Sequence, residues 1–134
     1  MLTLGGYINI IIAFGHIVGL FWAKKMFEAT QIGKTMNRLE KIHPNIPHIL
    51  TITVASGFFI FGLYGLSADG IIQELPYLKT GTFAIGAVYM LRGLGVLIYR
   101  AIAGSYSSKD VFFSTIAVFI GFLFLLGGFN KWNQ

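Results

Sequence analysis

The chain has 134 residues, of which 55% are hydrophobic and only 11% are charged, and its formal net charge is +5. Soluble domains carry about 25% charged residues, so this composition excludes a soluble globular domain with an ordinary polar surface. The absence of cysteine excludes disulfides, thiolate metal sites and cysteine nucleophiles. The positive charge fits the loop bias of a membrane protein better than it fits nucleic-acid binding.

Four apolar runs are each long enough to cross a ~30 Å hydrocarbon core as a helix of about 20 residues. We predict membrane helices over residues 4–23, 48–67, 80–101 and 111–129. The first run is not a cleavable signal, because no Lys or Arg precedes it and two lysines rather than small residues follow it. The predicted fold is all-α: a polytopic membrane protein in which residues 1–134 form a single transmembrane domain, an antiparallel four-helix bundle.

The long first connection, residues 24–47, is basic. Within it, Met36, Leu39 and Ile42 recur at helical spacing. This pattern predicts a short amphipathic helix that lies on the inner leaflet, with its Lys and Arg side chains near anionic headgroups.

The distribution of basic residues predicts the orientation. Seven lie in or beside the first and third connections: Lys24, Lys25, Lys34, Arg38, Lys41, Arg100 and Lys109. Only Lys79 and Lys131 lie on the other side. By the positive-inside rule, both termini are then outside and the first and third connections are cytoplasmic.

Small residues at spacings of four or seven predict where helix backbones approach one another. The pattern occurs at Gly15 and Gly19, at Gly57, at Gly86 and Gly93, and at Ser114, Gly121 and Gly128.

Arg92 lies inside the third apolar run, where a charge costs about 2.5–3.5 kcal/mol on insertion scales. None of the four runs contains Asp or Glu. At 1.5 Å per residue, Arg92 and His16 both lie roughly 10–14 Å from the inner boundary, in one layer. We therefore interpret them as the centre of a ligand-binding site. The further candidates are polar side chains on the first three runs: Asn9, Tyr64, Tyr89 and Tyr99. The alternative is that Arg92 only snorkels to the inner headgroups.

The same residues exclude several functions. A cation-coupled small multidrug exporter needs an intramembrane carboxylate, and bis-histidine haem ligation needs a second intramembrane histidine besides His16. We expect neither a catalytic residue nor a metal site. The sequence specifies no cofactor, although a lipid or a quinone is conceivable.

The stretch "FGLYGLSADGIIQELPYLKTGTFAIGAVYMLRGLG" is similar to a group of uncharacterised small four-helix bacterial inner-membrane proteins. The shared pattern is Tyr-x-Leu-Ser, then Leu-Pro, then Tyr-x-x-Arg-Gly, here at Tyr64, Ser67, Leu75, Pro76, Tyr89, Arg92 and Gly93. A histidine in the first helix, here His16, is also common in that group. The resemblance implies a multi-pass protein of the bacterial inner (cytoplasmic) membrane, and no activity.

"KIHPNIPH" resembles, more weakly, the membrane-associated eicosanoid and glutathione metabolism family, whose members are trimeric four-helix enzymes. His43 and Asn45 match the family pattern, whereas His48 stands where the family has a glutamate. In this resemblance, Arg92 corresponds to the third-helix arginine.

Our leading hypothesis is a non-enzymatic binding or accessory subunit in which Arg92 meets an anionic lipid, a quinone-like head group or a partner's carboxylate. Its expected partners are membrane lipids and either further copies of the chain or a larger membrane complex, and not nucleic acid. One alternative is an enzyme, glutathione-transferase-like, acting on a lipophilic substrate with His16 as proton carrier. Another is an oligomeric anion conduit.

Overall fold

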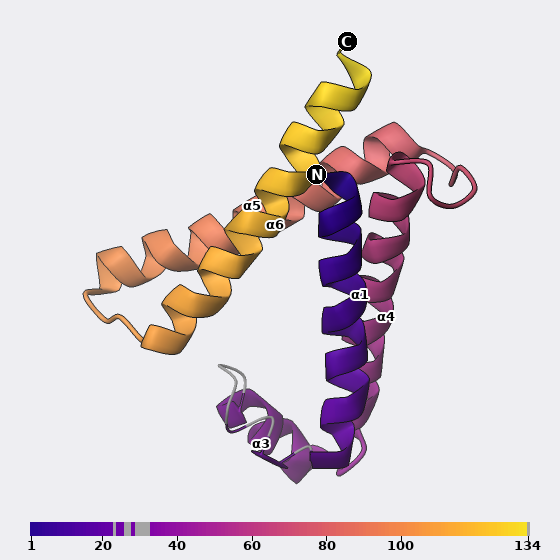
Figure 1. Cartoon of the computed structure of the whole chain (residues 1–134). Helices are drawn as coiled ribbons and strands as arrows, with labels where there is room; N and C mark the ends of the chain where they lie inside the picture. The colour runs from indigo at the N-terminus through magenta and orange to yellow at the C-terminus, as the bar shows by residue number, and fades with distance from the viewer. Residues whose placement is uncertain (23, 26–27, 29–32, 134) are drawn as a thin grey trace.

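The computed structural model describes residues 1–22, 24–25, 28 and 33–133, and this part of the chain contains helices and no strand (Figure 1). The elements in chain order are α1 (Leu2–Gly19), the 3₁₀ turn η1 (Leu20–Trp22), α3 (Gly33–Ile42), α4 (Ile46–Ala68), α5 (Leu78–Ala103) and α6 (Ser108–Trp132).

Four of these helical segments are long and apolar enough to cross a membrane. They have 21 to 26 residues each: Leu2–Trp22, Ile46–Ala68, Leu78–Ala103 and Ser108–Trp132. This confirms the prediction of four membrane-length helices. Three of them extend beyond the predicted bounds at both ends. Polar residues just outside the apolar runs, such as Lys79 before one run and Lys131 after another, continue the helical backbone hydrogen bonding.

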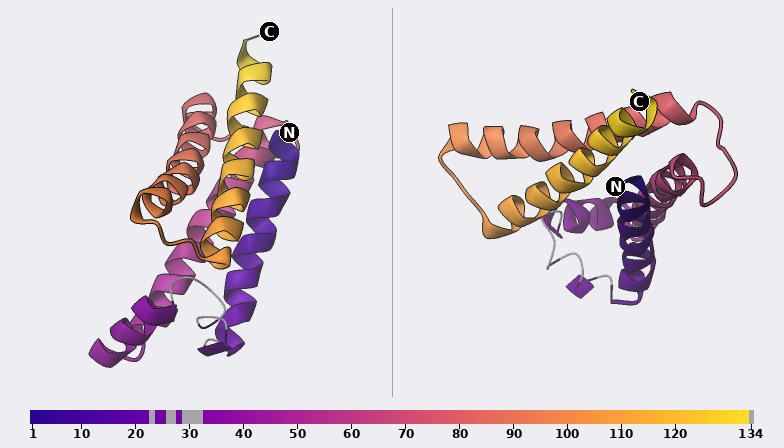
Figure 2. Two further views of the ribbon diagram at one scale, coloured as in Figure 1. Left: turned by 90° about the vertical axis from the view of Figure 1, so that its left-hand side faces the viewer. Right: turned by 45° about the horizontal axis from the view of Figure 1, so that its top comes forward.

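The four long helices form two closely packed pairs, α1 with α4 and α5 with α6, and the second pair is inclined to the first (Figures 1 and 2). The pairs meet at the end that carries both chain termini and residues 69–77, which we call the terminal end. They diverge toward their other ends, where α3 lies beside the first pair and residues 104–107 join the helices of the second (Figure 1). We call these two ends together the basic end.

Glycines allow the helices to touch at the terminal end. A β-carbon on Gly6 would lie 2.9 Å from the carbonyl oxygen of Gly62, and one on Gly65 would lie 2.8 Å from the backbone of Gly6. Asp69 adds a polar connection, because its Oδ2 accepts from the Thr3 backbone N–H at 2.7 Å and from the Thr3 hydroxyl at 2.6 Å. The start of α1 is therefore fixed against the end of α4.

The predicted small-residue faces on α5 and α6 are also in close contact. A β-carbon on Gly86 would lie 2.7 Å from Leu125, and one on Gly93 would lie 2.8 Å from the Ser114 carbonyl. Gly121 packs in the same way against the backbone of Met90, at 3.0 Å. These contacts confirm the prediction for this helix pair.

The prediction is wrong for Gly15 and Gly57, because a β-carbon on either would have no neighbouring atom within 4 Å. The packed face of α1 instead follows Gly6, Asn9 and Ala13, which are buried at spacings of three and four. Gly15 lies two residues off that face and is exposed.

The predicted amphipathic helix in the first connection is present as α3, which packs against the start of α4. Met36 is buried, whereas Ile42 is 72% exposed. Residues 26–27 and 29–32 of the same connection lie outside the described residues.

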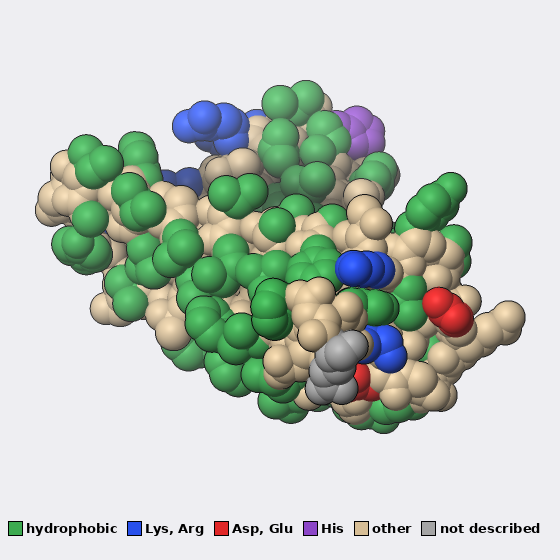
Figure 3. Space-filling view, turned by 90° about the horizontal axis from the view of Figure 1, so that it is seen from above, with side chains coloured by type: hydrophobic (Ala, Val, Ile, Leu, Met, Phe, Trp, Pro, Cys, Tyr) green, Lys and Arg blue, Asp and Glu red, His purple; other side chains and the backbone are tan. Residues whose placement is uncertain are grey.

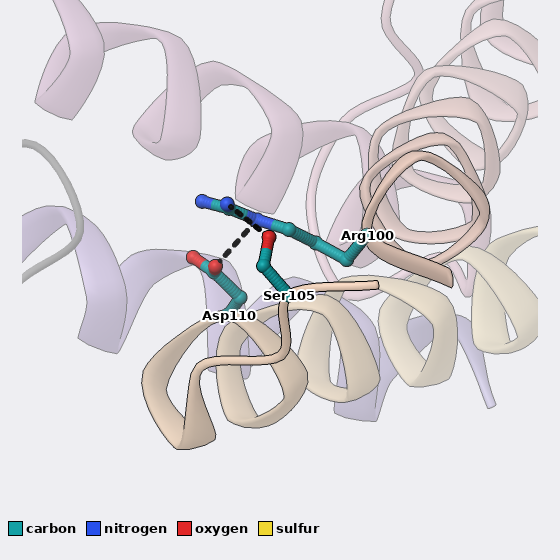
Figure 4. Close-up of polar contacts among 3 residues, drawn as sticks. All are labelled: Arg100, Ser105 and Asp110. Carbon is teal, nitrogen blue, oxygen red and sulfur yellow. Dashed lines mark hydrogen bonds and ion pairs between the residues drawn. The ribbon is translucent and has the colours of Figure 1, made fainter. Parts of the chain in front are cut away.

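An ion pair links α5 to α6 at the basic end. Arg100 Nε lies 2.7 Å from Asp110 Oδ2, and an Arg100 guanidinium N–H donates to the Ser105 hydroxyl at 3.5 Å (Figure 4). Lys109, in the first turn of α6, donates to the Glu28 carbonyl at 3.0 Å. These contacts connect the hairpin of α5 and α6 both internally and to the basic first connection.

Candidate ligand cavity among the four helices

A cavity of about 430 Å³ lies between the two helix pairs, on the basic side of their closest contact. All four membrane-length helices contribute to its wall. Its polar side chains are His16, Tyr89 and Arg92, and its aromatic wall includes Phe58, Phe61 and Phe113. The volume falls within the range of about 300–1,000 Å³ that is typical of small-molecule sites.

His16 reaches the cavity from α1. Its Nδ1 lies 2.8 Å from the Ile12 carbonyl oxygen one turn earlier, which fixes the orientation of the ring. The ring also packs against Phe58 of α4, with 5.2 Å between the ring centroids. The imidazole is therefore held on two sides while another part of it contributes to the cavity wall.

Tyr89 and Asn9 join α5 to α1 beside the cavity. The Tyr89 hydroxyl donates to Asn9 Oδ1, and Asn9 Nδ2 donates to the Gly5 carbonyl at 2.8 Å. Both side chains are buried, and Asn9 is completely so. Asn9 does not line the cavity itself but positions the tyrosine that does.

Arg92 lies one turn beyond Tyr89 on α5, in the direction of the basic end, and its side chain is exposed. Residues three apart on a helix share a face, with about 5–6 Å between their β-carbons. Arg92 therefore lines the cavity on the same side of α5 as the tyrosine.

Two of the predicted site residues lie elsewhere. The Tyr64 hydroxyl donates to the Pro76 carbonyl at 3.0 Å. Nearby, Ser67 donates to the Gln73 carbonyl and accepts from the Leu75 N–H, each at 2.9 Å. The Tyr-x-Leu-Ser and Leu-Pro motifs thus build the turn between α4 and α5.

Tyr99 is exposed, and its ring centroid lies 6.0 Å from the Arg100 guanidinium carbon.

The sequence interpretation missed the aromatic wall. Phe58 and Phe61 are three residues apart on α4 and contact the Tyr89 ring at centroid distances of 6.4 and 6.0 Å. Apolarity alone gave no signal, because the chain has 13 phenylalanines.

Of the residues that resemble the membrane-associated eicosanoid and glutathione metabolism family, Arg92 lines the cavity, whereas those of "KIHPNIPH" lie near the start of α4, away from its wall. His43 Nδ1 accepts from the Asn45 N–H at 3.2 Å, which is a local turn contact. His48 lines a separate hollow at the basic end with Lys24, Lys25 and Glu40. Among the described residues, no group of three or more His, Asp or Glu side chains is placed to hold a metal ion.

The cavity therefore combines an apolar, largely aromatic wall with a guanidinium, an imidazole and a phenol. Such a wall can cover a lipophilic ring or chain, and a guanidinium binds carboxylate, phosphate or carbonyl oxygen in a fixed geometry. Comparison of the chain with protein-family models, curated proteins and solved structures finds no significant match.

Proposed function

We propose that this chain is a non-enzymatic binding protein of the bacterial inner membrane. Its ligand is a lipophilic molecule with an anionic or quinone-like head group, held in the cavity among the four helices. Arg92 donates to an oxygen of the head group, His16 makes a second polar contact, and the aromatic wall covers the ring. The observation that carries the proposal is the convergence of Arg92, His16 and Tyr89 on one cavity of about 430 Å³.

The surface of the protein supports the membrane setting. Hydrophobic side chains are spread over the face seen in Figure 3, and charged side chains appear in only a few places. Large apolar residues are exposed along every long helix, for example Ile11, Phe59, Leu91 and Phe119. Soluble monomers rarely expose continuous apolar patches of this kind, whereas lipid-facing helices do.

In the proposed orientation, the four long helices form an antiparallel bundle with the terminal end outside and the basic end in the cytoplasm. The charge distribution supports this orientation, because seven of the ten basic side chains lie in or beside the first and third connections. Ile42, exposed on α3, would then contact the inner leaflet beside anionic headgroups.

The cavity also supports a binding role for Arg92 over simple snorkelling. A snorkelling arginine extends along a lipid-facing surface to reach the headgroups. Arg92 instead lines a partly open cavity to which all four membrane-length helices contribute side chains. A ligand oxygen at that position would offset part of the cost of placing a charge at this depth.

The proposal is tested by removing the charge and identifying what is lost. Wild type, Arg92→Met and a control variant, Arg38→Gln on the exposed side of α3, are purified in lipid nanodiscs. The co-purifying molecules are then identified by mass spectrometry. We expect one lipophilic species to accompany wild type and Arg38→Gln and to be absent from Arg92→Met, with all three proteins monodisperse.

The contrary result is also clear. If Arg92→Met keeps every co-purifying molecule and gains heat stability, Arg92 only snorkels. If the species lost is a stoichiometric protein with a carboxylate opposite Arg92, the site serves a partner subunit and not a small ligand.

A further inference from the structure

The directions of the hydrogen bonds around the cavity restrict the chemistry of its ligand. We infer that the cavity selects an aromatic head group carrying two features: a free hydroxyl that donates, and an anionic or carbonyl oxygen that accepts. The inference rests on the proposed function and adds to it the polarity of each contact. It separates a phenol or quinol-type lipid from the same lipid with its hydroxyl methylated.

A backbone hydrogen bond determines which nitrogen of His16 carries the proton. Its Nδ1 lies 2.8 Å from the Ile12 carbonyl oxygen, and a carbonyl oxygen can only accept. Nδ1 therefore carries the proton, and in the uncharged ring Nε2 is an acceptor. Because His16 lines the cavity, the group that it offers to a ligand is an acceptor that requires a donor.

The hydrogen bond with Asn9 determines the direction in which the Tyr89 hydroxyl donates. Asn9 Nδ2 donates to the Gly5 carbonyl, and this contact fixes which end of the amide is the oxygen. Asn9 Oδ1 then faces the Tyr89 hydroxyl, which must be the donor in that contact. The phenolic proton is thus already used, so the Tyr89 oxygen can only accept from a ligand.

The Arg92 guanidinium has five N–H donors and no acceptor, so a contact with a neighbouring group still leaves donors for a ligand. The polar wall of the cavity therefore offers donors from one residue, Arg92, and acceptors from two, His16 and Tyr89. A complementary head group presents an acceptor oxygen to Arg92 and a hydroxyl to His16, because the Tyr89 oxygen is held against the buried Asn9. The Phe58 and Phe61 rings beside them favour an aromatic ring between the two groups.

Methylating the ligand hydroxyl removes the only donor that the acceptor side of the cavity can use. An acceptor buried without a partner loses its hydrogen bond to water and gains nothing in return. A site built to hydrogen bond a hydroxyl therefore rejects the analogue that lacks the donor. We expect the methylated compound to bind about ten-fold to a hundred-fold more weakly.

The test uses three probes with the full chain in nanodiscs: 3-decyl-4-hydroxybenzoate, its 4-methoxy analogue, and 2-decylphenol, which lacks the carboxylate. Dissociation constants are measured by calorimetry for wild type, His16→Phe, His16→Gln and Arg92→Met. Phenylalanine keeps an aromatic ring against Phe58 and removes the acceptor. Glutamine restores an acceptor oxygen and so controls for loss of the fold.

In wild type, we expect the hydroxy acid to bind at least ten-fold more tightly than its methoxy analogue. His16→Phe should remove this preference, and His16→Gln should keep most of it. Arg92→Met should weaken both benzoates and leave the phenol nearly unchanged.

Two results overturn the inference while leaving the proposed function intact. One is equal binding of the hydroxy and methoxy compounds by wild type, with both weakened by Arg92→Met. The other is a full hydroxyl preference in His16→Phe. If wild type binds none of the three compounds, or if Arg92→Met binds them as wild type does, the proposed function fails and the inference fails with it.

Discussion

The terminal and basic halves of the bundle differ in how closely the two helix pairs approach one another (Figure 1). In the terminal half, a β-carbon on Gly65 would lie 2.8 Å from the backbone of Gly6, so α1 and α4 are in backbone contact. Farther toward the basic end of α4, Gly57 has no atom within 4 Å of its β-carbon position. A β-carbon on Gly5 of α1 would lie 2.8 Å from the Phe124 ring of α6, so the terminal half also holds the two pairs together. Their divergence beyond it leaves room for the cavity (Figure 1).

The border between the two halves is polar. At this border Asn9 of α1 and Tyr89 of α5 hydrogen bond to each other, and His16 and Arg92 follow on the basic side. Lipid is as apolar as the protein interior, so helices are held together by close packing and by hydrogen bonds such as this one. We infer that the terminal half provides stability and that the basic half provides the candidate ligand site.

We expect the largest effect on stability at the glycines of α4, where one glycine is in backbone contact and another has no neighbour. Gly65→Ala places a methyl group against the Gly6 backbone, which cannot move aside, and should destabilise the fold by about 1–3 kcal/mol. Gly57→Ala meets open space and should change stability by less than about 0.5 kcal/mol. Unfolding in a denaturing detergent measures both. Equal effects of the two substitutions would remove the distinction between the halves.

A smaller effect is expected at the border. Tyr89→Phe leaves Asn9 Oδ1 buried without its donor, which should cost about 1–2 kcal/mol in the same unfolding assay. Tyr99→Phe is the matched control, because Tyr99 is 66% exposed, and it should have no measurable effect. Tyr89→Phe as stable as wild type would show that this hydrogen bond does not hold α1 to α5.

The smallest effect is expected at the basic end. Asp110→Asn removes the ion pair with Arg100, whose side chain is 37% exposed, so the loss should be only about 0.2–1 kcal/mol. The consequence should be local: faster hydrogen exchange of the amides at residues 104–110 and unchanged exchange at residues 69–77. Uniform acceleration in both regions would mean that the basic end also controls the global stability.

The sequence predicted the positions of the membrane-length helices better than the faces by which they pack. Runs of about 20 apolar residues define membrane helices because the bilayer thickness sets their length. Hydropathy does not choose a face, because lipid and the bundle interior favour the same side chains. Glycine therefore occurred both at a contact, as at Gly86, and away from contacts, as at Gly15.

The candidate site was predictable in part. Counting residues from the helix ends placed Arg92 and His16 in one layer, and both line the cavity. Tyr64 was not separable from Tyr89 by composition, because its role depends on the Pro76 carbonyl in a turn that the sequence does not reveal. The aromatic wall at Phe58 and Phe61 required the helix rotations that only the structure provides.

The central claim is that the cavity holds a particular ligand, and photocrosslinking in intact cells tests it most directly. p-Benzoylphenylalanine is introduced at Phe61, which lines the cavity, or at Phe59, which is exposed on the lipid side. We predict that the Phe61 position captures one lipophilic species of defined mass and loses it when Arg92→Met is added, whereas the Phe59 position captures mixed membrane phospholipids. The same phospholipid mixture at both positions, unchanged by Arg92→Met, would contradict the account.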